Sequence, residues 1–271
     1  MPKFAEYCDN TLFYHHTLDE TPNPGDFTMH NHPSYEIYYF ISGRGGFYIE
    51  GNEYRLHRGD LLIMRSAEAH YIAVEPNVPY ERFALHFDRA LIEDADKDGL
   101  LLEAFDTREA GRGNLFTQND FKDGLYAALL RNIMNSAPEH RHLQAVTNLF
   151  ALLNEIRIAF GRSKTHALPE KESLSGSIIS YINANLSQPI SLDGICGHFY
   201  ISKAQLCRIF KKTTGATVWE YVTAKRLSAA RGMILSGVPA TSAFSECGFK
   251  DYSAFYRAYR RHFGFSPAKT R

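Results

Sequence analysis

The last hundred residues of the chain contain one pattern twice, a short helix followed by a tight turn and a second helix. In the first copy Ser191 is typical of a helix N-cap, a turn follows at residues 198–201, and Ser202 begins the next helix. The second copy repeats this order, and a long amphipathic helix is expected between the copies. The connecting helix is expected at residues 218–236. In the second copy, the short helix is expected at 240–247, the turn at 248–249 and the outer helix at 251–262. The pattern predicts two helix-turn-helix units in an all-α domain.

The outer helix of each unit is basic on the side that should face solvent. The first carries Lys203, Arg208, Lys211 and Lys212, and the second carries Arg257, Arg260 and Arg261. At 1.5 Å per residue the connecting helix is about 28 Å long, close to the roughly 34 Å between successive major-groove segments on one face of B-DNA. Two outer helices could therefore enter one DNA duplex together. An all-helical protein-interaction module is the alternative.

The net charge of the chain is zero, but its two halves differ in sign. From Ser173 to the C-terminus there are 13 Lys and Arg against 4 Asp and Glu, whereas residues 1–172 hold 17 against 26. A basic half joined to an acidic half indicates a polyanion-binding domain carried by a separate domain, unless the charges only form a solvated face. The sign changes in a polar, aperiodic segment. The expected domains are residues 1–160 and 173–271, with a linker at 161–172.

The N-terminal half changes its period near residue 88. Short alternating runs between Thr28 and Phe87 predict a small β-barrel, and two amphipathic helices at about 120–135 and 140–160 predict a helical hairpin, with Gly161 as a C-terminal cap. The apolar stripe of the first helix is expected to consist of Phe121, Leu125, Leu129 and Ile133. That of the second helix is expected to consist of Leu143, Val146, Phe150, Leu153, Ile156 and Phe160. The hairpin either covers the barrel or forms a dimer surface, and we predict a homodimer.

Composition excludes several classes of protein. No apolar run approaches the roughly 20 residues that span a bilayer, and the first residues lack the apolar core of a signal peptide, so we expect a soluble cytoplasmic protein without a membrane partner. The four cysteines are scattered, which argues against a zinc knuckle or a disulfide framework. In the outer helix of the first unit, Leu206 and Phe210 fix the buried side, so Cys207 should be exposed and face DNA.

The C-terminal sequence resembles the DNA-binding domain of the AraC-type (arabinose-regulator) transcription factors. The matching positions are Ser202, Leu206, Arg208, Phe210, Lys211, Gly215, Tyr221, Arg226, Leu227, Gly248, Phe249, Phe255, Arg257, Gly264, Ser266, Pro267 and Arg271. The resemblance implies a double-stranded DNA operator, RNA polymerase as a further partner, a role as an activator and no enzymatic activity. It also implies that Cys196, at a small core position of the family, is buried.

The same resemblance assigns DNA contacts to both outer helices. It implies that Ala204, Cys207 and Arg208 face the groove and that Lys203, Gln205 and Lys211 lie near phosphates. On the second helix, the residues implied to face the groove are Tyr252, Ser253, Tyr256 and Arg257. Those implied to lie near phosphates are Lys250, Arg260 and Arg261. We expect Arg208 to recognise guanine, while Arg257 could instead form a structural ion pair.

The N-terminal half resembles the cupin-like sensor domain of many members of that family. Its motifs provide His30, His32, Glu36, Gly43, Gly59, Asp60 and His70, whereas Arg65 stands where a cupin usually has proline. His30, His32 and Glu36 share parity, so a continuous strand would point them to one face. The expected fold is α+β with two domains: a cupin-like β-barrel with a helical hairpin, then two helix-turn-helix units.

The residues of this motif leave two interpretations open. With Tyr38, the residues His30, His32, Glu36 and His70 could line a metal-free pocket for a small effector, and the mixture of tyrosine, histidine and glutamate suits a sugar. Alternatively, His30, His32, Glu36 and His70 could bind iron, manganese, nickel or zinc. The second interpretation would make the chain a metal-dependent cupin enzyme tethered to a DNA-binding domain. We expect the first, with no cofactor.

Overall fold

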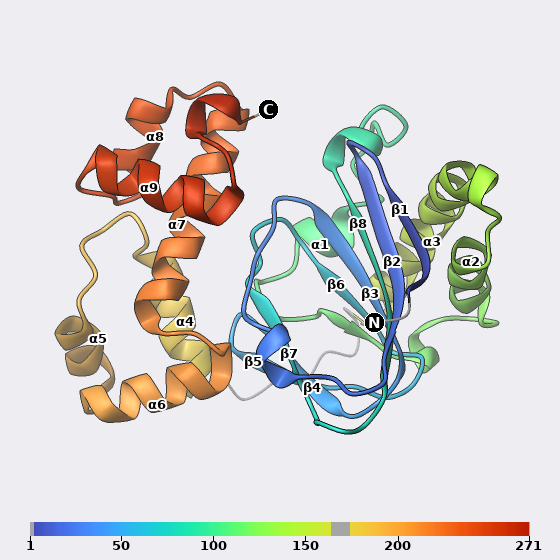
Figure 1. The fold of residues 1–271 in the computed structure, drawn as a ribbon, viewed down its shortest axis with the longest axis horizontal. Helices are drawn as coiled ribbons and strands as arrows, with labels where there is room; N and C mark the ends of the chain where they lie inside the picture. Colours follow the sequence, from blue (N-terminus) through green and yellow to red (C-terminus); the bar gives the residue numbers. More distant parts are fainter. Residues whose placement is uncertain (1–2, 164–173, 271) are drawn as a thin grey trace.

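The chain folds into a β-rich domain and an all-α domain, seen in a computed structural model that describes residues 3–163 and 174–270 (Figure 1). The β-rich domain contains the strands and the helices α1 to α3, and the all-α domain begins with α4. Two domains of the expected kinds are therefore confirmed. No helix in the described part is long and apolar enough to span a bilayer.

Two antiparallel sheets form the barrel. The larger has the strand order β1-β2-β8-β3-β6-β9, and the smaller has the order β5-β4-β7. The strands are β1 (Lys3–Cys8), β2 (Leu12–Asp19), β3 (Tyr35–Ser42), β4 (Gly45–Ile49), β5 (Asn52–Arg55), β6 (Leu61–Met64), β7 (His70–Val74), β8 (Tyr80–Phe87) and β9 (Leu115–Phe116). Alternation in β3 sends Ile37 to the outer core and sends Tyr38 and Phe40 inside the barrel. The strands β1 and β2 precede the predicted β region and extend the larger sheet at its edge.

The helices α2 (Leu125–Met134) and α3 (Arg141–Ser163) cover the outer face of the larger sheet (Figure 1). A helical hairpin is confirmed, but two expected stripe residues, Leu125 and Leu143, are exposed. The reason is the register: α2 begins only after Gly124, so its buried face consists of Tyr126, Leu129, Leu130 and Ile133. Gly161 lies inside α3 and is not its cap.

The end of α3 also affects the predicted linker. The helix continues to Ser163, so residues 161–163 are helical, and residues 164–172 of the predicted linker lie outside the described residues. The short elements of this half are α1 (Glu103–Asp106) and the 3-10 turns η1 (Pro24–Asp26), η2 (Arg89–Leu91), η3 (Gln118–Asp120) and η4 (Pro138–His140).

The C-terminal domain has the two predicted helix-turn-helix units. The first is α5 and α6, the second is α8 and α9, and α7 joins them. Their bounds, with those of the preceding and following elements, are α4 (Leu174–Ala184), α5 (Leu192–Phe199), α6 (Lys203–Thr214), α7 (Val218–Leu235), α8 (Ala240–Glu246), α9 (Tyr252–Phe263) and η5 (Pro267–Lys269). The Ser191 and Ser202 side chains accept hydrogen bonds from the amides of Gly194 and Gln205, so both predicted N-caps are confirmed.

Candidate functional site

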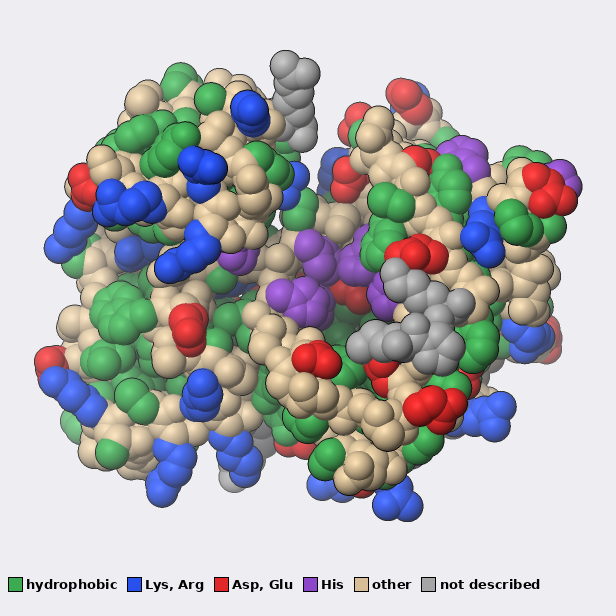
Figure 2. Space-filling view, viewed as in Figure 1, with side chains coloured by type: hydrophobic (Ala, Val, Ile, Leu, Met, Phe, Trp, Pro, Cys, Tyr) green, Lys and Arg blue, Asp and Glu red, His purple; other side chains and the backbone are tan. Residues whose placement is uncertain are grey.

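The outer helices α6 and α9 present basic, solvent-exposed faces. Each begins at a capped residue, Ser202 or Asp251, and buries one apolar side against α7, including Phe210 in α6 and Phe255 in α9. Figure 2 shows Lys and Arg side chains distributed over this domain. The opposite sides of the two helices are therefore free to meet a polyanion.

The structure leaves most predicted DNA-contact residues accessible. Gln205 and Tyr256 are half-buried, and the others are exposed: Lys203, Ala204, Cys207, Arg208, Lys211, Lys250, Tyr252, Ser253, Arg257, Arg260 and Arg261. Lys203 Nζ pairs with Asp193 at 2.7 Å. Within the described residues Arg208 and Arg257 form no ion pair, so the structure gives no support to a structural pair at Arg257. Arg271, a position of the resemblance, lies outside the described residues.

The cysteines differ in accessibility. Cys207 is exposed, as expected, whereas Cys196 is half-buried rather than buried. Cys196 packs at the margin of its core because α5 is short and its outer side meets solvent.

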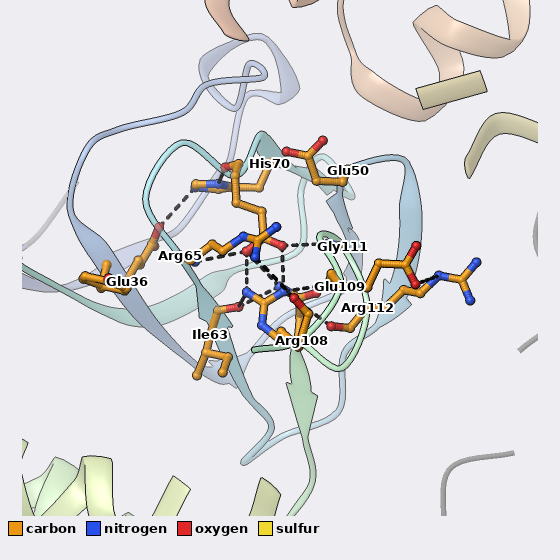
Figure 3. Close-up of polar contacts among 12 residues, drawn as sticks. Glu36, Glu50, Ile63, Arg65, His70, Arg108, Glu109, Gly111 and Arg112 are labelled. Atoms are coloured by element: carbon orange, nitrogen blue, oxygen red, sulfur yellow. Dashed lines mark hydrogen bonds and ion pairs between the residues drawn. The ribbon is translucent and has the colours of Figure 1, made fainter. Parts of the chain in front are cut away.

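A second candidate site is a cluster of histidines at the mouth of the barrel. His32 Nε2 lies 2.9 Å from a carboxylate oxygen of Glu36, and His70 Nε2 lies 3.1 Å from the same oxygen (Figure 3 shows the Glu36–His70 contact). His30 faces His70 with their ring centroids 4.4 Å apart. Histidine side chains gather in the hollow between the barrel and the C-terminal helices (Figure 2). The predicted residues thus converge.

The local backbone differs from the continuous strand that we expected. β3 begins at Tyr35, and His30 belongs instead to an isolated bridge with His70. Pro33 lacks a backbone N–H and so interrupts the ladder between the two histidines and Glu36. The predicted continuous strand through His30, His32 and Glu36 is therefore wrong, although the three side chains still meet. Tyr38 lies deeper, buried in the barrel core, where its hydroxyl is 2.7 Å from that of Tyr80.

Sequence reasoning missed His86, which completes the cluster. In the pairing of β3 with β8, His86 stands opposite Glu36, and its Nε2 lies 3.9 Å from the Glu36 carboxylate. Nothing in the local sequence around His86 resembles a ligand motif. The signal is the register between strands fifty residues apart, which sequence alone does not fix.

The rings of the cluster are oriented by hydrogen bonds on their far side. The Nδ1 atoms of His30, His32 and His70 lie 2.9, 3.0 and 2.8 Å from the backbone carbonyl oxygens of Thr28, Ser34 and Glu68. A carbonyl only accepts, so each Nδ1 carries a proton, and the Nε2 atoms of His32 and His70 are directed at the Glu36 carboxylate. The same arrangement is common for histidines that bind metals.

Burial and charge act in opposition in the cluster. Burial alone would raise the pKa of Glu36, but the nearby His86 and His70 and the hydrogen bond from His32 together hold it well below its usual range. Burial lowers the pKa of His86 to about 4, against the attraction of Glu36. The site therefore combines one buried carboxylate with at least one neutral imidazole at neutral pH.

This donor set fits a transition-metal ion. The donor atoms of His30, His32 and His70 lie within 4.8 Å of one another, as do those of His32, Glu36 and His86. Imidazole nitrogens with one carboxylate suit zinc, iron or nickel, and such an ion would supply Lewis acidity and a positive charge beside Glu36.

Comparison with known proteins agrees with the structure. The family description "AraC-like ligand binding domain" matches residues 20–155, and "Helix-turn-helix domain" matches residues 195–271. The chain is 24% identical to an uncharacterized HTH-type transcriptional regulator, YfiF, of Bacillus subtilis, over 94% of this chain and 82% of that protein. It is also 24% identical to the HTH-type transcriptional activator RhaS of Escherichia fergusonii, over 91% of this chain and 88% of that protein.

Solved structures are also similar to the chain. The fatty-acid-bound ToxT of Vibrio cholerae matches with a TM-score of 0.43 at 10% identity, covering 96% of this chain and 95% of that one. The DNA-binding domain of AdpA, solved with a target DNA, matches with a TM-score of 0.33 at 22% identity, covering 34% of this chain and 84% of that one.

Proposed function

The chain belongs to the AraC family of transcription regulators, and from this premise we propose that it binds its operator by inserting α6 and α9 into neighbouring major-groove segments. The observation that carries the proposal is the pair of capped, basic outer helices on the two ends of α7. At 1.5 Å per residue α7 is about 27 Å long, which suits a single duplex read at two sites.

The test is selection of duplexes from a random-sequence pool by the full chain. We expect a consensus with two blocks separated by about one helical turn. Arg208→Ala and Arg257→Ala should each weaken the base preference within one block of the consensus. Arg44→Ala, a control at an exposed arginine of the barrel domain, should leave the consensus unchanged. Recovery of no consensus would contradict sequence-specific binding.

We further propose that the histidine cluster binds a small polar effector. His30, His32, Glu36 and His70 supply polar groups at the mouth of the barrel, whereas Tyr38 is enclosed in the core and would support the site from below. A sugar suits such donors and acceptors. A thermal-shift screen of the full chain against sugars, organic acids and metals tests this, because a ligand that prefers the folded state raises the unfolding temperature.

The second candidate function is a metal-dependent enzyme, which the converging Nε2 atoms favour. Metal analysis of protein purified without added metals distinguishes the metal-dependent enzyme from the effector sensor. Near-stoichiometric iron, manganese, nickel or zinc that disappears in a His30→Ala, His32→Ala variant would favour the metal-dependent site, and turnover would then be required to call it an enzyme. Metal-free protein that binds an organic effector would favour the sensor.

We place the domain boundaries at 1–160 and 173–271 with a linker between them, and we expect a homodimer acting as an activator with RNA polymerase in the cytoplasm, where the DNA is. Supporting the dimer, Leu125 and Leu143 are exposed on the outer side of α2 and α3. The absence of enzymatic turnover remains an expectation.

A further inference from the structure

We propose that the second helix-turn-helix unit recognises thymine, through the methyl group that this base presents in the major groove, by means of an aromatic surface that the first unit lacks. The inference rests on the proposed function and names the kind of base that one of the two units selects. It starts from a comparison of the two units with each other, because their backbones can be matched residue by residue.

The two outer helices match along their whole length. Both α6 and α9 have 12 residues, and the fourth and eighth residues of each are buried: Leu206 and Phe210 in α6, Phe255 and Tyr259 in α9. Because the buried positions coincide, residues at the same position of the two helices lie on the same side of each helix. Differences between matched residues on the solvent side are therefore differences in what each unit offers to a ligand.

The turns give the match between the shorter helices, α5 and α8. After α5 the amide of Ile201 donates to the carbonyl of Cys196 at 3.1 Å, and after α8 the amide of Phe249 donates to the carbonyl of Phe244 at 3.0 Å. Each hydrogen bond closes the same kind of turn at a helix C-terminus. Phe244 therefore occupies the position that Cys196 occupies in the first unit.

The matched positions on the surface differ in chemistry. The first and fifth residues of α6 are Lys203 and Cys207, whereas those of α9 are Tyr252 and Tyr256. With Phe244, the two tyrosines give the second unit three aromatic side chains at positions where the first unit has none. We call Phe244, Tyr252 and Tyr256 the aromatic strip.

The rings of the aromatic strip form a continuous and accessible surface. Phe244 meets Tyr252 edge to face with ring centroids 5.4 Å apart, and the centroids of Tyr252 and Tyr256 are 6.5 Å apart. Tyr252 is 36% exposed and Tyr256 is half-buried, whereas Tyr259 on the core side is fully buried. Among the residues that the structure describes, none forms a hydrogen bond with the hydroxyl of either strip tyrosine. Both rings are thus available to a ligand.

The surroundings of the aromatic strip favour DNA as that ligand. The second unit lies at one end of α7 (Figure 1), and Lys250, Arg257 and Arg260 are exposed beside the strip. These cations attract a polyanion, whereas an apolar protein surface would bury them without partners. A duplex lets the cations meet phosphates while the rings face the bases.

The chemistry of the rings then selects the base. Aromatic carbons neither donate nor accept hydrogen bonds, so they gain nothing from the polar edges of the bases. The C5 methyl group of thymine is the apolar group that a base pair presents in the major groove. A strip of aromatic rings on α9 therefore favours thymine at the positions that it covers.

The test is a pair of selections by the full chain from random-sequence duplex pools that differ only in one base. One pool contains dT and the other contains dU, which lacks the C5 methyl group and keeps the hydrogen-bonding groups of thymine. From the dT pool we expect two blocks, one of them with preferred thymines. From the dU pool the preference at those positions should be lost. In titrations, one dT→dU replacement there should weaken binding about three- to fourfold, as expected for one buried methyl group.

The variants assign this preference to the aromatic strip. Tyr252→Ala, Tyr256→Ala should lose the thymine preference in the dT pool at the same positions that the wild type loses in the dU pool. Tyr252→Phe, Tyr256→Phe keeps both rings and should keep the preference. Tyr200→Ala is the matched control, because it removes a tyrosine that is 95% exposed in the turn of the first unit, and it should select as the wild type does.

The possible outcomes distinguish this inference from the proposed function. Two blocks that are the same in the dT and dU pools, or a thymine preference that survives in the alanine variant, would overturn the inference and leave sequence-specific binding intact. Absence of a consensus from both pools would overturn sequence-specific binding and the thymine preference together. The comparison of pools uses only the wild type, so it does not depend on the folding of a variant.

Discussion

At the scale of single residues, the exposed guanidinium of Arg208 is the sharpest test of how α6 meets DNA. Arg208→Ala should cost about 1–3 kcal/mol of binding free energy on the selected operator and relax the preference at one base pair, because arginine pairs in bidentate fashion with guanine. Titrations with single-base variants of the operator measure this. Equal loss on every sequence would mean that Arg208 contacts only phosphate.

A buried ion pair in the barrel gives a second residue-scale prediction. Glu68 is enclosed and accepts hydrogen bonds from Arg108 at 2.7 Å and from the Gly111 amide at 2.7 Å. Arg108→Met should lower the free energy of unfolding by about 3–5 kcal/mol, because it leaves a buried carboxylate without its cation. Denaturant unfolding of the full chain measures the loss.

The matched control is Arg44→Met, since Arg44 pairs with Glu75 at 3.9 Å and both side chains are exposed. An exposed pair contributes at most about 1 kcal/mol. Similar losses in the two variants would show that burial of Glu68 does not increase the loss of unfolding free energy when its cation is removed.

At the scale of elements, the accessibility of α6 can be measured with a thiol reagent. In a Cys8→Ser background, a bulky maleimide should label Cys207 quickly, whereas burial raises the pKa of Cys247 to about 11 and keeps that thiol unreactive. Bound operator should protect Cys207 because α6 then lies in the groove. Labelling that is unchanged by operator would place α6 outside the groove.

The hairpin of α2 and α3 carries the dimer prediction. Leu129 and Phe150 are poor probes, because Leu129 is buried in the core of its own chain and Phe150 packs against that core. Leu125→Glu, Leu143→Glu changes exposed positions and should convert a dimer to a folded monomer by sedimentation. A folded dimer that survives both changes would place the interface elsewhere.

The elements differ in how far the sequence determines them. Helix starts such as those at Ser191 and Ser202 could be predicted because capping is a local interaction. The buried face of α2 could not be predicted, because it depends on the residue at which the helix begins. The role of His86 could not be predicted either, because it depends on the pairing of β3 with β8. Glu50 was missed for the same reason, since its hydrogen-bond partners include side chains of the C-terminal domain.

At the scale of the whole molecule, the buried pair of Glu50 and Lys225 links the stabilities of the two domains. Lys225→Met should lower the free energy of unfolding by about 3–5 kcal/mol, because Glu50 stays buried without its cation. The double variant Glu50→Gln, Lys225→Met should lie within about 1 kcal/mol of the wild type, since no unpaired charge remains. Calorimetry measures both, with Lys97→Met, which removes an exposed lysine paired with Asp94, as the control. If single and double variants are equally unstable, packing rather than charge holds the domains.

The same carboxylate limits how this regulator can be recombined with others. A chimaera that joins the barrel to a foreign DNA-binding domain keeps Glu50 but loses its partners Asn183, Tyr221 and Lys225. The Glu50 carboxylate, on a turn with strained backbone, is then either exposed to solvent or buried without a partner. Exchange of domains therefore requires moving the turn with its three partners, or neutralising Glu50 at the graft.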